Sequence, residues 1–149
     1  MHLRGKKVNF FITGTRRGLG KALSSLYDTV DCLEDCDVFI NCKHNGYEQV
    51  ELLYKAAELN KRIINIGSNS PDENKRQPHK YQIEKFALDK ANDQLFYQGI
   101  NTTIVRFGFF DSPRVAGVDK PKMPISYCVS VIDWILEQPH RVKEITVTP

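Results

Sequence analysis

A serine, a tyrosine and a lysine near the middle of the chain have the types and spacing of a proton-transfer site. Ser68 ends an apolar run, Tyr81 follows thirteen positions later, and Lys85 comes four positions after that. Positions i and i+4 share one face of a helix, so the phenol and the ammonium can address one point. A phenol is a poor acid or base at neutral pH, and a fixed ammonium beside it favours the phenolate. The spacing therefore predicts that Tyr81 exchanges a proton with a substrate.

A glycine-rich stretch, residues 14–20, has the spacing G-x-x-x-G-x-G between an apolar run and a helical pattern. Such a turn lets the backbone approach a pyrophosphate at a helix N-terminus, although a tight turn without a ligand is the alternative. Arg16 and Arg17 could hold a 2′-phosphate between guanidinium groups. No second strand clearly carries an acid for the ribose 2′-hydroxyl, since Asp35 and Asp37 only precede the next apolar run. We therefore predict NADP(H) in preference to NAD(H).

Alternating patterns predict the elements that would position these residues. β-favouring apolar runs predict strands at 8–12, 38–42, 62–67, 101–107 and 144–147. Helical spacing predicts helices at 18–28, 47–59, 81–98 and 129–136. The polar segments 69–80 and 109–124 are expected to be loops, the second a flexible active-site lid. This order predicts one α/β domain over residues 1–149, with a three-layer, Rossmann-like, doubly wound parallel sheet.

Composition excludes several other classes of protein. The chain has 149 residues, 41% of them apolar, and a dispersed net charge of +3, which does not favour a nucleic-acid partner. No apolar run approaches the roughly 18 residues of a membrane span, and the N-terminus lacks the apolar core of a signal peptide. We expect a cytoplasmic protein without a membrane partner. Cys32, Cys36, Cys42 and His44 lack the paired spacing of zinc ligands, so we predict no metal site and reduced thiols.

Taken together, these motifs resemble those of the short-chain dehydrogenase/reductase family. Residues 13–20, Thr-Gly-Thr-Arg-Arg-Gly-Leu-Gly, are similar to its TGxxxGxG cofactor motif. Residues 41–44, Asn-Cys-Lys-His, fall where the family has Asn-Asn-Ala-Gly and keep only the first Asn. Residues 107–112, Phe-Gly-Phe-Phe-Asp-Ser, resemble the Pro-Gly segment that covers the nicotinamide, with Phe for Pro and Ser for the usual Thr. The likeness runs nearly from end to end.

The resemblance implies a role for each member of the serine, tyrosine and lysine set, which matches the family's catalytic Ser and YxxxK motif. Tyr81 would give or take the proton at the substrate oxygen, and Ser68 would hydrogen-bond that oxygen. Lys85 would hold the nicotinamide ribose and favour the phenolate. Asn45 is the nearest match to a fourth member, an Asn in the helix before the serine strand, but it requires a one-residue shift.

The resemblance also implies the groups that would touch the cofactor. With Tyr81 and Lys85, they are Gly14, Thr15, Arg16, Arg17, Gly18, Leu19, Gly20, Asn41, Cys42, Lys43, Ile66, Phe107, Gly108, Phe110 and Ser112.

One stretch departs from the family pattern, because only ten residues separate Tyr27 from Val38. That is too few for the strand, helix and strand that usually form half of the adenosine pocket. A direct connection from helix 18–28 to strand 38–42 would be left-handed, which parallel crossovers avoid in about 98% of cases. Either residues 29–31 keep a stub of the missing strand or the chain is rearranged there. We favour the stub.

The function implied is NADP(H)-dependent interconversion of a carbonyl and an alcohol on a small molecule. The alternative is a nucleotide-binding sensor or structural protein of the same fold with weak or lost turnover, and a nucleotide-free scaffold is a third reading. The helices 47–59 and 81–98 correspond to those through which the family associates, so we expect a homodimer or homotetramer.

Overall fold

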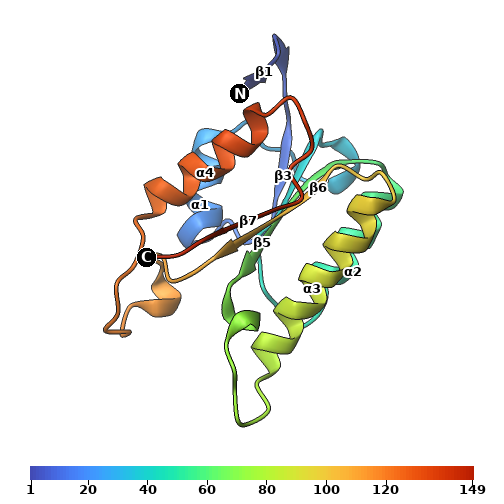
Figure 1. Ribbon diagram of the computed structural model, residues 1–149. Helices are drawn as coiled ribbons and strands as arrows, with labels where there is room; N and C mark the ends of the chain where they lie inside the picture. The colour runs from blue at the N-terminus through green and yellow to red at the C-terminus, as the bar shows by residue number, and fades with distance from the viewer.

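The computed structural model describes all 149 residues and has a parallel five-stranded sheet with the order β3-β4-β5-β6-β7 (Figure 1). Its strands are β3 (Phe10–Ile12), β4 (Val38–Asn41), β5 (Arg62–Ser68), β6 (Thr102–Phe107) and β7 (Glu144–Val147). The helices are α1 (Gly18–Leu26), α2 (Glu48–Glu58), α3 (Lys80–Tyr97) and α4 (Ile125–Glu137). Short 3-10 turns are η1 (Leu33–Asp35), η2 (Ser70–Asp72) and η3 (Pro113–Val115). The predicted fold class and every predicted strand and helix are confirmed, with ends displaced by a few residues.

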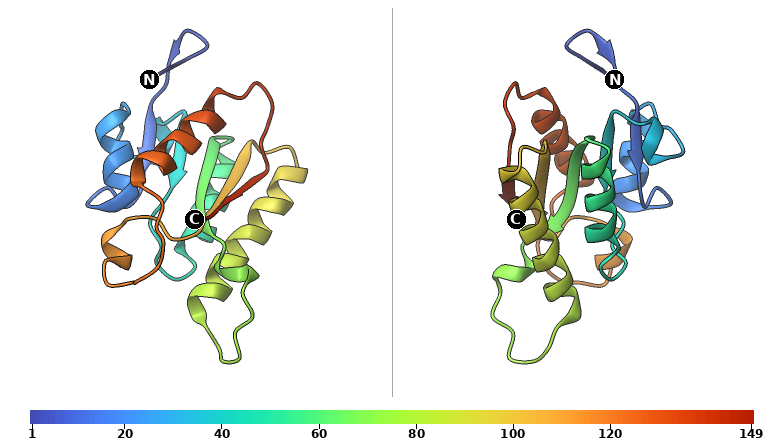
Figure 2. Two further views of the ribbon diagram at one scale, coloured as in Figure 1. Left: turned by 60° about the vertical axis from the view of Figure 1, so that its left-hand side comes forward. Right: turned by 90° about the vertical axis from the view of Figure 1, so that its right-hand side faces the viewer.

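Helices α1 and α4 cover one face of the sheet, and α2 and α3 cover the other (Figure 2). Side chains alternate between these faces along each strand, so Phe39 packs with the α2–α3 core and Ile40 with the α1–α4 core. Both are completely buried. Because helices cover both faces, β5 and β6 are buried along nearly their whole length, including where they carry polar side chains.

A remnant of the missing strand lies along the free edge of β3, as predicted. The Phe10 amide donates to the Asp28 carbonyl at 2.8 Å, and the Val30 amide donates to the Phe10 carbonyl at 2.8 Å. These bonds form an isolated parallel bridge between Phe10 and Thr29, while β4 occupies the other edge of β3. The connection from β3 through α1 therefore leads to the stub, on the side of β3 opposite to β4. The chain then returns through η1 to β4, burying Leu33 in the α2–α3 core.

A small hairpin at the N-terminus was not predicted. Strands β1 (His2–Leu3) and β2 (Lys6–Lys7) pair antiparallel, and the hairpin projects from the sheet near the end of α4 (Figures 1 and 2). Its turn contains Arg4 and Gly5 at φ values of 51° and 78°. Two-residue strands with mostly polar side chains give no periodic signal to detect.

The two ends of the irregular segment 109–124 are hydrogen-bonded to each other, and Met123 anchors them in the core. The Asp111 amide donates to the Met123 carbonyl at 2.8 Å, and the Met123 amide donates to the Phe109 carbonyl at 2.9 Å. The Met123 side chain is buried in the α1–α4 core. No helix in the structure combines the length and apolarity required to cross a membrane.

Candidate active site

The predicted site residues gather at the carboxyl ends of the parallel strands. The glycine-rich turn follows β3, Asn41 ends β4, Ser68 ends β5 and Phe107 ends β6. In open α/β sheets, ligands bind in the crevice outside this edge. The topology therefore brings together segments that are far apart in the sequence.

Lys85 lies on the buried side of α3, with 3% of its surface exposed. Its ammonium donates to Gln49 Oε1 at 2.8 Å and to the Ile66 carbonyl at 3.0 Å. Burial disfavours the charged form and lowers the pKa of Lys85 to about 8. The ammonium lies 5.6 Å from the centre of the Tyr81 ring, so the structure places the predicted Tyr81 and Lys85 side chains together.

Tyr81 sits in the first turn of α3, where His79 caps the helix by accepting the Gln82 amide at 3.3 Å. Its ring is flanked by two groups that the sequence did not single out. The Arg114 guanidinium carbon of η3 lies 4.2 Å from the ring centre, and the His44 ring contacts it edge-on at 4.8 Å. Arg114 thus places a cation against the π-face of the phenol.

His44 itself is held in a mostly buried position. Its Nε2 lies 3.4 Å from a Glu84 carboxylate oxygen, and its Nδ1 is buried without a partner. Burial, together with the nearby Lys85 and Arg114 charges, lowers the pKa of His44. The imidazole beside Tyr81 is therefore neutral at neutral pH.

Ser68 is buried at the end of β5 and its hydroxyl accepts the Ser70 amide at 3.0 Å. Its own proton has no acceptor within the protein and can be donated to a ligand. The turn after it is fixed from two sides. Gln82 of α3 donates to the Ser70 carbonyl at 2.7 Å, and Arg106 of β6 donates to Asp72 at 2.6 Å. The strand of Ser68 and the helix of Tyr81 are thereby linked.

Gln49, which sequence reasoning missed, joins this site to the sheet. It is 2% exposed, and its Nε2 donates to the Asn41 carbonyl at 2.8 Å and to the Ile66 carbonyl at 3.0 Å, while Oε1 accepts from Lys85. The Asn45 amide instead donates to Glu48 at 2.8 Å on the exposed surface. Asn45 therefore does not join the hydrogen bonds around Lys85, in which Gln49 is the partner from α2. A polar residue four positions before Leu53 on the apolar face of the helix was the available signal.

The Asn41 side chain also makes its hydrogen bonds inside the protein and is not exposed at the surface. Its Nδ2 donates to the Gln49 carbonyl at 2.8 Å and to Asn65 Oδ1 at 2.9 Å, and the residue is completely buried. Asn65 continues this buried chain to Asn92 at 3.0 Å. Cys42, beside Lys85, stays protonated because burial raises the pKa of its thiol to about 11.

The glycine-rich turn packs tightly against the start of α1. A Cβ on Gly20 would lie 2.1 Å from the Gly14 carbonyl oxygen, a contact that no side chain can occupy. Gly14 has φ +73°, and a Cβ there would meet Lys43 Cβ at 3.1 Å. The Thr13 hydroxyl accepts the Cys42 and Lys43 amides at 2.9 and 3.0 Å, which ties the ends of β3 and β4 together. This close packing brings the backbone of the turn directly against the first residues of α1.

The segment after β6 closes over the same turn. Phe110 packs its ring edgewise against Phe107, with centres 5.6 Å apart. A Cβ on Gly18 would lie 3.8 Å from both Ser112 and Pro113. Of the predicted residues of this segment, Ser112 therefore lies close to the N-terminus of α1, whereas Phe107 and Phe110 pack in the core. Gly108 is crowded by Thr148 at the end of the chain.

A cavity of about 410 Å³ lies between the glycine-rich turn and the strand remnant, lined by Thr15, Ser24, Thr29 and Asp31 among others. Arg16 and Arg17 in the adjacent turn are exposed and form no ion pair with a carboxylate. Asp31, which immediately follows the bridge to Phe10, was not predicted as a site residue because the stub lacks a strand pattern. The helix N-terminus at the glycine-rich turn, the close glycine packing and this cavity fit the pyrophosphate and nucleoside parts of a dinucleotide.

No three His, Cys, Asp or Glu side chains gather in a group that could hold a metal ion, and all four cysteines are free thiols.

Comparison with solved structures identifies the fold. A 3-alpha-hydroxysteroid dehydrogenase from Pseudomonas sp. B-0831, complexed with NADH, has a TM-score of 0.71 at 14% identity, over 94% of this chain and 95% of that chain. An alcohol dehydrogenase from the archaeon Thermococcus sibiricus, complexed with 5-hydroxy-NADP, has a TM-score of 0.70 at 14% identity, over 95% of each chain.

A short chain dehydrogenase from Burkholderia cenocepacia J2315, in complex with NADP, has a TM-score of 0.68 at 14% identity, over 95% of this chain and 88% of that chain. No protein-family model and no curated protein sequence matches. The chain therefore has the Rossmann-like fold of short-chain dehydrogenases.

Proposed function

We propose that this chain is an oxidoreductase of the short-chain dehydrogenase/reductase type, which interconverts a carbonyl and an alcohol on a small molecule with NADP(H). The observation that carries the proposal is the position of Lys85, buried and hydrogen-bonded beside the Tyr81 ring at the carboxyl edge of the sheet. A stable core alone does not require a buried ammonium there. The likeness to structures that contain NADH and NADP supports the cofactor class.

In this proposal a bound nicotinamide cofactor supplies the hydride. Tyr81 gives a proton to the substrate oxygen during reduction and takes it back during oxidation. Lys85 holds a positive charge beside the phenol, and it can fulfil this role only while it is protonated, below about pH 8, because its pKa is lowered to about 8. Ser68 donates its free hydroxyl proton to the same oxygen and so orients the substrate.

The cofactor preference follows from three charges at the turn and its neighbouring cavity. Arg16 and Arg17 favour the 2′-phosphate of NADP(H), whereas Asp31 favours the 2′-hydroxyl of NAD(H) and repels a phosphate. Because both guanidinium groups lack a carboxylate partner, two cations oppose one anion, and we assign the preference to NADP(H). Arg17→Ala should weaken the binding of NADPH far more than the binding of NADH. Asp31→Asn should strengthen the binding of NADPH and leave that of NADH no stronger. Equal effects of either change on both cofactors would overturn the assignment.

A sensor without turnover is the second candidate. Arg114 and His44 flank Tyr81, and the segment 112–113 lies over the N-terminus of α1, so that the protein's own groups crowd the crevice. The two candidates differ in chemistry, not in binding. Binding of NADPH without its oxidation across a broad panel of aldehydes and ketones would favour the sensor.

The deciding experiment combines cofactor fluorescence with turnover in the wild-type protein and Tyr81→Phe. We expect NADPH to bind both proteins equally and only the wild type to reduce carbonyl compounds. Tyr97→Phe, at an exposed tyrosine near the other end of α3, is the matched control and should keep full activity. Turnover by Tyr81→Phe at the wild-type rate would refute the role of the phenol, and no binding of NADPH at millimolar concentration would refute both candidates.

We also propose that the protein forms a homodimer or homotetramer through the outer surface of α2 and α3. Large apolar side chains are exposed on these helices, at Tyr54 and on α3 at Ile83, Phe86 and Tyr97. Exposed apolar groups clustered on neighbouring helices favour association. The cytoplasmic location and the lack of nucleic-acid and membrane partners stay predictions.

A further inference from the structure

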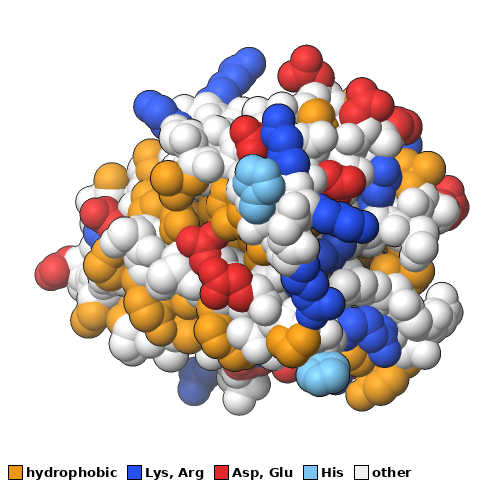
Figure 3. All heavy atoms as spheres, turned by 90° about the horizontal axis from the view of Figure 1, so that it is seen from above, with side chains coloured by type: hydrophobic (Ala, Val, Ile, Leu, Met, Phe, Trp, Pro, Cys, Tyr) orange, Lys and Arg blue, Asp and Glu red, His pale blue; other side chains and the backbone are white.

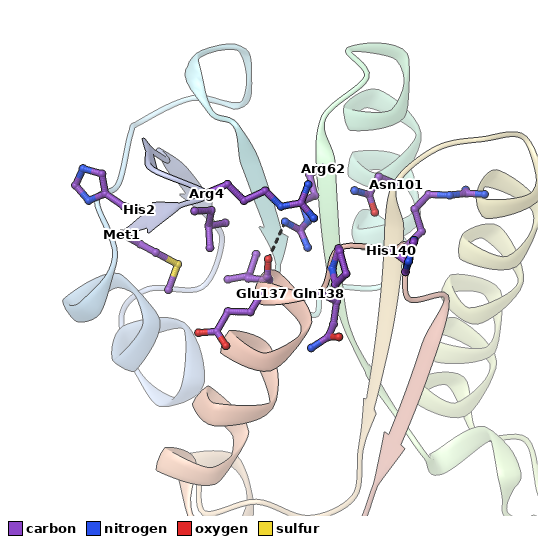
Figure 4. Close-up of a pocket in the computed structure, with 12 residues that line it drawn as sticks. Met1, His2, Arg4, Arg62, Asn101, Glu137, Gln138 and His140 are labelled. Atoms are coloured by element: carbon purple, nitrogen blue, oxygen red, sulfur yellow. Dashed lines mark hydrogen bonds between the residues drawn. The ribbon is translucent and has the colours of Figure 1, made fainter.

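A second hollow lies at the opposite edge of the sheet, far from Tyr81. It has a volume of about 430 Å³ and is formed by the β1–β2 hairpin, the start of β5, the end of α4 and the loop that follows (Figure 4). This edge is the one seen from above in Figure 3, where blue and pale blue side chains gather. Nothing in the proposed reaction uses this hollow.

Its charged lining is predominantly basic. Arg4, Arg62 and Arg141 line it together with two histidines, and Glu137 is the one carboxylate among the lining residues. None of the three guanidinium groups forms an ion pair with a carboxylate. In Figure 4 the side chains of Arg4 and Arg62 approach each other, while the Glu137 carboxylate points away from them.

Main-chain groups, rather than counter-charges, hold these cations in place. Arg62 donates to the carbonyls of Ile135 and Leu136 at 3.0 and 3.1 Å, at the C-terminal end of α4. Arg141 donates to the carbonyls of Phe96 and Ile100 at 2.7 and 3.1 Å. Both guanidinium groups are therefore positioned without a carboxylate partner, although the C-terminal carbonyls of α4 offset part of the Arg62 charge.

The arrangement carries an electrostatic cost that an anion would relieve. Burial and the neighbouring charge of Arg4 both lower the pKa of Arg62. Like charges held close together in a partly desolvated hollow repel each other, and an anion between them converts the repulsion into attraction. Guanidinium forks match carboxylate and phosphate oxygens.

We propose that this hollow binds the phosphate group of a small molecule. Phosphate fits better than a carboxylate, because its tetrahedral oxygens accept hydrogen bonds from several directions and the guanidinium groups come from three separate segments. Its double negative charge also matches several unneutralised cations more closely. The volume lies within the range of small-molecule sites. The site is independent of the proposed oxidoreductase activity.

The test titrates inorganic phosphate, and separately ADP, into the ¹⁵N-labelled full chain and follows backbone amide shifts. We expect saturable shifts at the amides of Arg4, Arg62, Gln138, His140 and Arg141 with at least one of the two probes. Saturation by ADP at much lower concentration than by phosphate would identify a nucleotide as the source of the phosphate group. Equal saturation would identify free phosphate. Shifts confined to residues 14–20, or shifts that never saturate at millimolar phosphate, would overturn the proposal.

Two variants test the residues directly. Arg4→Asn keeps a residue type that tolerates the positive φ of this turn, and should weaken binding about tenfold, the loss of one charge-assisted hydrogen bond. Arg76→Asn makes the same charge change in the exposed loop at the catalytic edge and should leave the affinity unchanged. Equal weakening by both variants would show a general effect of net charge and refute a built site.

Discussion

Replacing Lys85 by Met should change how the stability of the protein depends on pH. Lys85 is 3% exposed, and burial lowers its pKa from 10.5 to about 8. A difference of one pKa unit corresponds to about 1.4 kcal/mol, so keeping this ammonium charged in the folded state costs about 3 kcal/mol at neutral pH. Met has a similar length and no charge. It removes this cost but leaves Gln49 Oε1 without a donor.

The sign of the effect follows from proton binding in the two states. Below pH 8 the lysine is charged in both states, and the cost is fully present. Between about pH 8 and 10.5 the folded lysine releases its proton while the unfolded lysine keeps it. The unfolded state then binds more protons, so the free energy of unfolding rises with pH. From pH 7 to about 9.5, the wild type should gain about 2 kcal/mol relative to Lys85→Met.

The measurement is urea unfolding of both proteins across this pH range, with the slope m compared to confirm that the unfolding reaction is the same. The difference between the two proteins cancels the titration of all other groups. Lys90→Met, at an exposed lysine of the same helix, is the control and should give a constant difference from the wild type. If the Lys85→Met difference is also constant with pH, the ammonium does not titrate near pH 8 and our account of its environment fails.

Three other substitutions test the framework of the site. Gln49→Leu removes an acceptor from the buried Lys85 ammonium and should lower the free energy of unfolding by about 2–3 kcal/mol, measured in urea. Gly20→Ala forces a Cβ to within 2.1 Å of a carbonyl oxygen and should destabilise the protein by about 3 kcal/mol, whereas Gly117→Ala, with no atom within 4 Å, should not. Phe86→Lys places a charge on the exposed apolar surface of α3 and should produce a monomer by light scattering; a wild-type monomer would refute the predicted association.

The sequence contained enough information for the sheet and its helices because their signals are local. Runs such as 62–67 reflect burial on both faces of the sheet, and the helical spacing around Leu88 and Leu95 reflects burial against one of these faces. Parallel topology then places every strand end at one edge, so Ser68, Tyr81 and the glycine-rich turn could be assigned to one site from the sequence alone. Even the stub at residues 29–31 followed from the rule on crossover handedness.

The site residues that could not be predicted from the sequence owe their roles to contacts between distant segments. Gln49 becomes important only because its amide reaches Lys85, thirty-six positions away. Arg114 reaches Tyr81 from an irregular segment without a pattern. Asp31 enters the cavity because a single bridge to Phe10 fixes the residues before it. Apart from Gln49, which interrupts the apolar face of its helix, these residues leave no periodic signal in the sequence, and Asn45 was predicted from its position relative to the family motif.

The buried polar groups around Lys85 bear on whether the site is used. Asn41, Gln49 and Asn65 form a connected chain of hydrogen bonds beneath the ammonium, which continues to the buried Asn92 and Thr102 and lies beside the apolar side chains of the α2–α3 core. An apolar side chain in place of Lys85 would relieve the desolvation cost, and an apolar core in place of the chain would be as stable or more so. A fold required only for stability does not need this arrangement. Holding a charge beside the Tyr81 ring does require it, which favours the enzyme over the scaffold.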